Sequence, residues 1–263
     1  AAQTIPTMTL TSSFAATSFT PVTGSGGTAP LSYAVTPGLP SGLSMSSSTG
    51  AITGTPSVTS SATTYTVTVT DAASGSATST FSLTVSVALT TTLAIASETL
   101  TASAVATPFT PVTTSGGTSP ISFAISLSLP SGLAINASTG AITGTPTASA
   151  VSTNYTVTAT DANGATSSKT FTLTVSTALS TTIAISSKTL TASVAATSFT
   201  PVTSSGGTPT LTYSISPSLP SGLSINSATG AITGTPSSSA VSANYTVTAT
   251  DANGVTSSKA FAL

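Results

Sequence analysis

Short stretches in which apolar and polar residues alternate recur along the whole chain. The segments 31–36, 65–70 and 81–86 each alternate an apolar residue with a small or polar one. A period of two with a single apolar face is the pattern of a half-buried strand in an antiparallel sheet. No comparable stretch shows the 3.6-residue period of an amphipathic helix. The pattern therefore predicts an all-β protein.

The same motifs return three times at a constant spacing. Leu-Pro-Ser-Gly-Leu begins at Leu39, Leu129 and Leu219, so each copy lies 90 residues after the previous one. A period of this length exceeds the roughly 20–45 residues of a solenoid repeat and is close to the roughly 100 residues of one sandwich domain. We therefore predict three tandem domains, at residues 1–88, 89–178 and 179–263.

Turn signals separate the strands within each repeat. Gly50 lies between two short strands, where a positive φ would close a hairpin. Asn163-Gly164 lies between the strand that begins near Tyr155 and the strand that contains Phe171, and Asn-Gly is a strong hairpin signal. About seven short strands per repeat predict three immunoglobulin-like antiparallel β-sandwich domains. Short, β-prone linkers without Gly or Pro, such as 87–91, favour a rod.

One tyrosine recurs at the same place in each repeat, as Tyr65, Tyr155 and Tyr245. Such a residue could stack against a ligand. Each copy, however, begins an apolar alternation, and this position favours a side chain in the sandwich core.

The recurring motifs are similar to those of a known family. The signature is Leu-Pro-Ser-Gly-Leu, then Thr-Gly-Ala-Ile-Thr-Gly-Thr-Pro, then Tyr-Thr-Val-Thr-Ala-Thr-Asp-Ala-Asn-Gly, and in some form it occurs three times. It resembles the "putative immunoglobulin-like" repeat family of bacterial surface proteins, and also the related dystroglycan-type cadherin-like repeats. The resemblance implies secreted, multi-domain adhesins, stalks and accessory modules at a cell surface. A fold alone does not fix a function.

Charged residues are very few, and this limits the possible partners. They make up 3% of the chain and give a net charge of −1. They are Asp71, Glu98, Asp161, Asp251, Lys169, Lys188 and Lys259. This composition cannot form the basic surface that nucleic-acid binding needs. No apolar run approaches 18 residues, so we expect no membrane insertion. The 38% of hydrophobic residues argues against a disordered chain.

The side chains that usually carry catalysis are missing from the sequence. There is no His and no Cys, which excludes Ser-His-Asp and Cys-His triads and the usual zinc sites. A glycosidase needs two carboxyl groups within about 5–10 Å, but each repeat has only one recurrent acid. We therefore expect no catalytic residue, no cofactor and no enzymatic activity.

Calcium is the one metal worth weighing, because the resemblance to cadherin-like repeats implies ions at domain junctions. Glu98 lies early in the second repeat, and Asp161 lies at a turn that should face the preceding domain. Calcium takes six to eight oxygen ligands, usually with several carboxylates, so two acids are too few for a tight site. Asp71, Asp161 and Asp251 are better explained as acceptors for backbone amides in the turn.

Three positions, Asn136, Asn154 and Asn244, match the Asn-x-Ser/Thr pattern of glycosylation. In a chain so rich in Ser and Thr such matches also arise by chance. O-linked sugar on the outward threonines and a bare hydroxyl surface remain the alternatives.

The third copy of the last strand is shorter than its siblings. Residues 171–176 read Phe-Thr-Leu-Thr-Val-Ser, whereas the third copy reads Phe-Ala-Leu and stops at Leu263. An open sheet edge invites pairing. A longer parent chain, a strand donated by a neighbouring copy, and a frayed end all remain open. The first two, together with the low net charge, lead us to expect self-association into a fibre or membership of a longer chain.

The loops are small, polar and nearly the same in each copy, which favours spacing over ligand binding. We therefore expect a structural extracellular stalk or filament of a cell surface, acting as a spacer or fibre. Attached glycans are an optional addition to this expectation. An adhesin or glycan-binding module and a phage or virion appendage protein are the alternatives.

Overall fold

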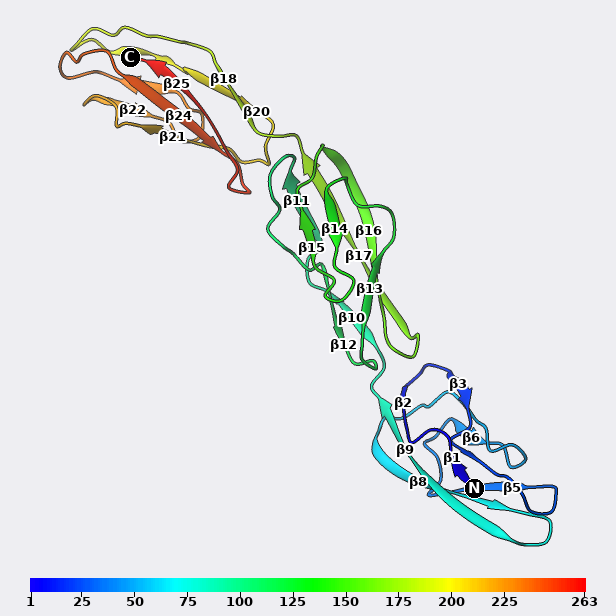
Figure 1. Cartoon of the computed structure of the whole chain (residues 1–263). Coiled ribbons are helices and arrows are strands. Elements are labelled where there is room, and N and C mark those ends of the chain that lie inside the picture. Colours follow the sequence, from blue (N-terminus) through cyan, green and yellow to red (C-terminus); the bar gives the residue numbers. More distant parts are fainter.

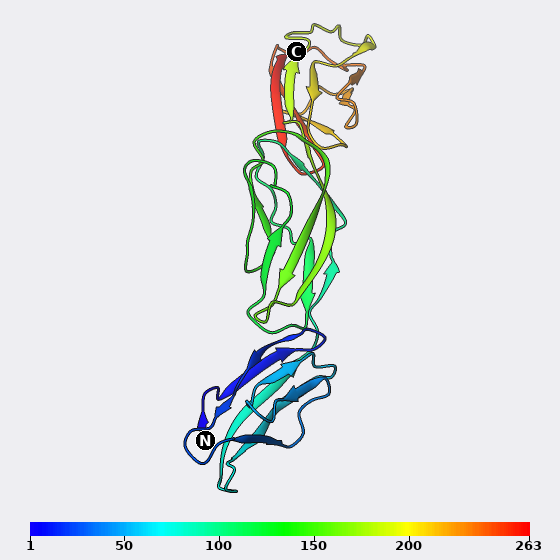
Figure 2. The same cartoon turned by 90° about the vertical axis from the view of Figure 1, so that its right-hand side faces the viewer.

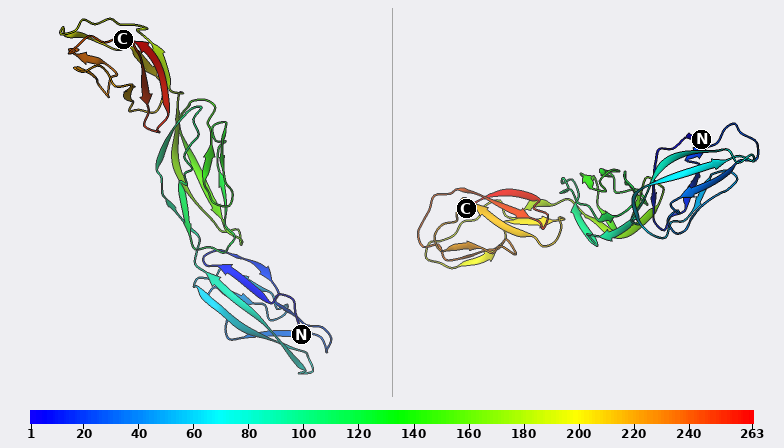
Figure 3. Two further views of the ribbon diagram at one scale, coloured as in Figure 1. Left: turned by 60° about the vertical axis from the view of Figure 1, so that its left-hand side comes forward. Right: turned by 90° about the horizontal axis from the view of Figure 1, so that it is seen from below.

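The three repeats form three β-sandwich domains that follow one another end to end. The computed structural model describes all 263 residues, and it contains strands but no helix. Figure 1 shows the elongated array, with the C-terminus at the far end of the third domain. Further orientations show the same succession of domains (Figures 2 and 3). The predicted all-β class and the tandem immunoglobulin-like sandwiches are confirmed.

The first domain has nine strands. They are β1 Ala2–Gln3, β2 Thr7–Thr11, β3 Ala16–Phe19, β4 Val22–Thr23, β5 Ser32–Thr36, β6 Leu43–Met45, β7 Ile52–Gly54, β8 Ser60–Thr70 and β9 Ser76–Ser86. One sheet has the order β2-β9-β8-β5 and the other has the order β3-β7-β6, while β1 pairs with β4.

The second and third domains repeat this plan. The second contains β10 Thr90–Leu93, β11 Ser97–Thr101, β12 Val112–Ser115, β13 Ser122–Ile125, β14 Leu133–Ile135, β15 Ile142–Gly144, β16 Ala150–Thr160 and β17 Thr166–Ser176. The third contains β18 Ser180–Ile183, β19 Ala196–Phe199, β20 Val202–Ser205, β21 Thr212–Ser216, β22 Leu223–Ile225, β23 Ile232–Gly234, β24 Asn244–Thr250 and β25 Thr256–Ala262. Their main sheets have the orders β11-β17-β16-β13 and β21-β24-β25.

Two details of the strand arrangement differ from the sequence prediction. The domains have nine, eight and eight strands instead of about seven, because very short edge strands such as β1 and β4 form their own pairs. In addition, β2 pairs with β9 in parallel, and β11 pairs with β17 in the same way. The first long strand of these two domains therefore lies beside the last one and ends at the boundary with the next domain.

The core of each sandwich comes from the apolar positions of the alternating segments. In the first domain Tyr65 and Phe81 are buried, and their rings stack with centroids 5.5 Å apart. The equivalent rings of Tyr155 and Phe171 are 6.0 Å apart. Burying an aromatic side chain removes a large apolar area from water, so this recurrent pair stabilises each domain. The predicted core role of the tyrosines is confirmed.

The predicted turns are also found. Gly50 has a φ of 71° and closes the hairpin between β6 and β7. Asn163 and Gly164 lie in the turn between β16 and β17, where Gly164 has a φ of 88°. Positive φ values cost glycine little because it has no Cβ atom.

The opposite face of each long hairpin carries hydroxyl groups. In the first domain Thr66 pairs with Thr80 and Thr68 pairs with Thr78 across β8 and β9. In the second domain the hydroxyls of Thr156 and Thr170 are 2.9 Å apart. The outer surface of the array is therefore polar but almost uncharged.

Candidate functional site at the domain junctions

The most specific polar contacts in the molecule lie between consecutive domains. Thr11 is the last residue of β2, and only 2% of its surface is exposed. Its hydroxyl donates a hydrogen bond to Oδ2 of Asp161, which follows β16 in the second domain. The domains are thus joined by a buried hydroxyl–carboxylate contact between residues 150 positions apart in the sequence.

Two further side chains of the second domain complete this contact. The Asn163 amide Nδ2 donates to the Thr11 hydroxyl at 2.9 Å and to the Thr118 hydroxyl at 3.0 Å. The backbone amide of Thr118 donates to Oδ2 of Asp161 at 2.9 Å. We call Thr11, Thr118, Asp161 and Asn163 together the first clasp.

The same contact recurs between the second and third domains. The second clasp consists of Thr101, Thr208, Asp251 and Asn253, each 90 positions after its counterpart. The Thr101 hydroxyl donates to Oδ2 of Asp251, and Asn253 Nδ2 donates to the hydroxyls of Thr101 and Thr208. Asn253 Nδ2 also donates to the backbone carbonyl of Thr99 at 3.0 Å. Two junctions with the same atomic partners indicate that the clasp is a property of the repeat.

Each clasp aspartate is held in place by its own turn. Oδ1 of Asp161 accepts the backbone amides of Asn163 at 2.9 Å and Ala165 at 2.8 Å. These are the turn hydrogen bonds that the sequence predicted. They point Oδ2 of Asp161 towards the preceding domain, where Thr11 meets it.

The clasp also favours the ionised form of Asp161. Burial by itself would raise the pKa of this carboxyl group. The hydrogen bonds from the Thr11 hydroxyl and from the backbone amides of Thr118, Ala165 and Asn163 outweigh that effect and lower the pKa below its ordinary value. The pKa of Asp251 is lowered by the equivalent set of partners, again against the opposing effect of burial.

Three-residue linkers pass close beside the clasps. The linker 87–89 joins β9 to β10, and the amide of Gly117 donates to the carbonyl of Val87 at 2.8 Å. A Cβ atom on Gly116 would lie 2.3 Å from the carbonyl oxygen of Ala88. Glycine at this position therefore lets the linker backbone lie directly on the second domain. The Leu89 side chain packs against Gly117 and is only 8% exposed.

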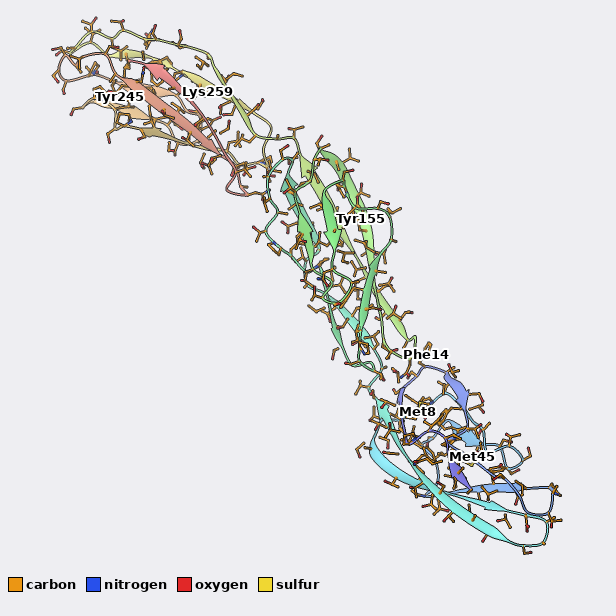
Figure 4. All side chains as sticks on the ribbon, viewed as in Figure 1. Met8, Phe14, Met45, Tyr155, Tyr245 and Lys259 are labelled. Carbon is orange, nitrogen blue, oxygen red and sulfur yellow. The ribbon has the colours of Figure 1, made fainter.

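Grooves next to the clasps are filled differently at the two junctions. Phe14 lies at the first junction, near Gly164 of the second domain (Figure 4). Its counterpart at the second junction is Ala104, which lines a groove of about 250 Å³ together with Glu98 and Asn253. Burial raises the pKa of Glu98, which lies in this groove.

The structure does not bring the two calcium candidates together. Asp161 contacts the first domain through Thr11, whereas Glu98 lines the groove beside Asn253 of the third domain. The two carboxylates therefore belong to opposite ends of the second domain. Both oxygens of Asp161 already accept hydrogen bonds from protein donors, and nowhere do three or more His, Cys, Asp or Glu side chains come together.

The three candidate glycosylation residues are exposed. Asn136 uses its side-chain oxygen to accept the amides of Ser138 and Thr139 in a turn. Asn154 uses its oxygen to accept the Thr172 hydroxyl at 2.8 Å. Asn244 begins β24. In Asn136 and Asn154 the side-chain oxygen is the atom that forms these hydrogen bonds, and the amide nitrogen forms none.

The family model described as "Putative Ig domain" matches the sequence three times, at residues 2–86, 88–176 and 177–263. The chain belongs to this family. The match covers nearly every residue and confirms the resemblance drawn from the repeated motifs. Immunoglobulin-like repeats are typical of structural and adhesion proteins, many of them extracellular, and no enzyme family is indicated. None of the elements is a helix that could span a lipid bilayer.

Solved structures of tandem immunoglobulin domains are also similar in outline. An I-band fragment from titin is 17% identical, with a TM-score of 0.47 over 98% of this chain and 94% of the fragment. Extracellular domains 3–5 of Drosophila OTK are 14% identical, with a TM-score of 0.40 over 98% of this chain and 94% of that one. The immunoglobulin domains 1–4 of Sidekick-1 are 14% identical, with a TM-score of 0.41 over 99% of this chain and 73% of that one. A search of curated proteins gave no match.

The sequence marks the clasp aspartates but gives no sign of their threonine partners. Asp161 stood out because acids are rare in the chain. Thr11 and Thr118 did not, because threonines are abundant throughout. The threonine at the end of β2 contacts a turn of the following repeat. This contact can be recognised only once the domains are placed end to end.

Proposed function

We propose that the chain is a structural extracellular stalk or filament protein of a cell surface, in which tandem domains act as a spacer or fibre. The observation that carries this proposal is the recurrence of the clasp at both junctions with the same atomic partners. A repeated, buried contact between neighbours fixes the angle between domains in the same way along the array. Such an arrangement supports extension, which is what a spacer requires.

The linkers support the same function. Only three residues separate β9 from β10 and β17 from β18. Three extended residues span about 10 Å, so consecutive domains cannot move far apart. The hydrogen bond from Gly117 to Val87, and its counterpart from Gly207 to Thr177, further restrict the linker backbone.

The low surface charge is compatible with association of several copies into an extracellular fibre. With a net charge of −1, copies of the chain repel one another only weakly, which favours association into a fibre. Sugars attached to exposed residues such as Asn154 would add the hydration that charge does not supply. The loops that join the strands offer no aromatic or charged cluster for a ligand, so a spacer is favoured over a binding module.

The proposal is tested on cells of the native source. Antibodies raised against the purified chain are applied to intact cells, and surface protease treatment is followed by immunoblotting. The expected result is labelling of intact cells and loss of the protein after protease treatment. Labelling that requires permeabilised cells, with protection from protease, would overturn the surface assignment.

A further inference from the structure

The outer end of the first domain carries most of the same groups that receive a neighbour at the two junctions. We call Gly26, Gly27, Thr28 and Asp71 the socket. Gly26 and Gly27 have φ values of 74° and 75°, as Gly116 and Gly117 have 72° and 75°. The amide of Thr28 donates to Oδ2 of Asp71 at 3.0 Å, and the Asp71 turn has the same backbone hydrogen bonds as the clasp turns.

In the second and third domains the equivalent socket is covered by the preceding repeat. Gly207 and Thr208 are buried in the third domain, whereas Gly117 and Thr118 are half-buried in the second. The Gly207 amide donates to the carbonyl of Thr177 at 2.8 Å. The leucine of each linker lies against the second glycine, with Leu179 Cδ1 3.1 Å from a Cβ built on Gly207. The occupant of a socket is thus an extended linker with a leucine, together with a threonine hydroxyl.

In the first domain these groups face solvent. Gly27 and Thr28 are exposed, and the Gly27 amide has no acceptor in the chain. A groove of about 240 Å³ lies beside the socket, and Leu31 and Val69 contribute apolar walls to it. Since the glycine conformation and the aspartate turn form without a neighbour, the socket is preorganised to bind one.

We infer that this end of the first domain is a docking face for the trailing end of another immunoglobulin-like repeat of the same type. The occupant would place its linker backbone on Gly26 and Gly27, its leucine in the groove, and its threonine hydroxyl on Oδ2 of Asp71. The inference rests on the proposed function, since end-to-end docking is how a spacer or fibre gains length.

The turn that follows Asp71 differs in sequence from the two clasp turns: residues 73–75 read Ala-Ser-Gly, against Asn-Gly-Ala at 163–165 and Asn-Gly-Val at 253–255. The first of these differences bears on docking. Ala73 stands where the clasps have Asn163 and Asn253, so the amide that donates to the incoming threonine is missing. Docking here therefore depends more on the linker and its leucine than it does at the internal junctions. This also means that the first domain holds its neighbour less tightly than the others do.

The test is a four-repeat chain, in which a second copy of residues 91–180 is fused directly before Ala1. This fusion keeps the register, because Ala1 occupies the position of Thr181 in the third repeat. Amide hydrogen exchange at Gly27 is measured in the three-repeat and four-repeat chains. We expect exchange at Gly27 to slow at least tenfold in the longer chain, as an amide does when it gains a buried acceptor.

Two matched variants show whether contact with the added repeat causes the slower exchange at Gly27. Gly26→Ala has no atom within 4 Å of the new Cβ in the three-repeat chain, whereas the Cβ at the equivalent Gly206 would lie 2.2 Å from the carbonyl oxygen of Ala178. At a φ of 74° an alanine is strained in both chains, so the slowing is measured as the ratio of Gly27 exchange between the short and the long Gly26→Ala chains. The clash with the docked linker arises only in the long chain, so the substitution should abolish the slowing. Leu179→Ser in the added copy should remove most of the slowing as well.

Protection of core amides in the added repeat shows that this repeat is folded. Unchanged exchange at Gly27 beside a folded repeat would overturn the inference, and so would equal slowing in the Gly26→Ala variant. Neither result bears on whether the three-domain array is a surface spacer, which is decided by labelling intact cells.

Discussion

Removing the hydroxyl of Thr11 should open the first junction without disturbing either domain. Every side-chain hydrogen bond of this hydroxyl goes to the second domain, to Asp161, Thr118 or Asn163. Thr11→Val keeps the shape of the side chain and deletes only these contacts. The lost hydrogen bond to an ionised carboxylate is worth about 1.5–3 kcal/mol. Taking about 2 kcal/mol, the ratio of closed to open junctions should fall roughly 30-fold.

The assay is hydrogen exchange at the Gly117 amide, which donates to Val87 across the junction and so reports its opening. Exchange should be about 30-fold faster in Thr11→Val, by the same conversion. Thr191→Val is the matched control, because Thr191 occupies the equivalent position in the third domain and is exposed. The reasoning fails if Gly117 exchanges at the parent rate in Thr11→Val, or if Thr191→Val accelerates it equally.

Three other outcomes follow from the site. Because the pKa values of Asp161 and Asp251 are lowered in the folded chain, the clasps are fully stabilising above the ordinary Asp pKa of about 3.9 and weaken as the pH falls through the lowered values. Interdomain distance distributions should therefore broaden only in acid; broadening that begins near neutral pH would contradict this. Burial raises the pKa of Glu98, so ionisation of this side chain opposes folding. Glu98→Met, which copies Met8 of the first repeat, should therefore stabilise the second domain by a few tenths to about 1 kcal/mol at pH 7. Urea unfolding should show a smaller gain at pH 4, where Glu98 is largely protonated. In intact-mass measurement, protein from the native source should exceed the mass of its own bare polypeptide, which is 25.1 kDa for these 263 residues and more if the gene product is longer. Asn154→Gln should remove part of the excess, and a mass equal to the bare polypeptide would refute glycosylation.

The long hairpins could be predicted from the sequence because their physics is local. Tyr65 begins an alternation that places every second side chain in the core, and β8 indeed contains it. The turn at Asn163 and Gly164 carries its own conformational signal. These features depend on neighbours within a few residues, so a single sequence contains them.

The parallel pairing and the clasps could not be predicted in the same way. β2 lies beside β9 at the opposite end of its repeat, and nothing local to Thr7–Thr11 indicates that partner. Thr11 and Asp161 lie in different repeats, and their contact depends on the angle at which two domains meet. Glu98 and Asp161 looked like one group because they share a repeat, but they belong to different junctions.

The central claim is that protein contacts alone fix the angle between consecutive domains. The chain has no cysteine, so spin labels can be placed cleanly at the equivalent exposed positions Thr78, Ser168 and Ser258, each changed to Cys. Pulsed electron spin resonance then measures the distance distribution across each junction in EDTA and in millimolar calcium. The account predicts one narrow distribution for the pair 78 and 168 and one for the pair 168 and 258, both unchanged by calcium. Broad distributions in EDTA, or distributions that narrow only when calcium is added, would contradict it.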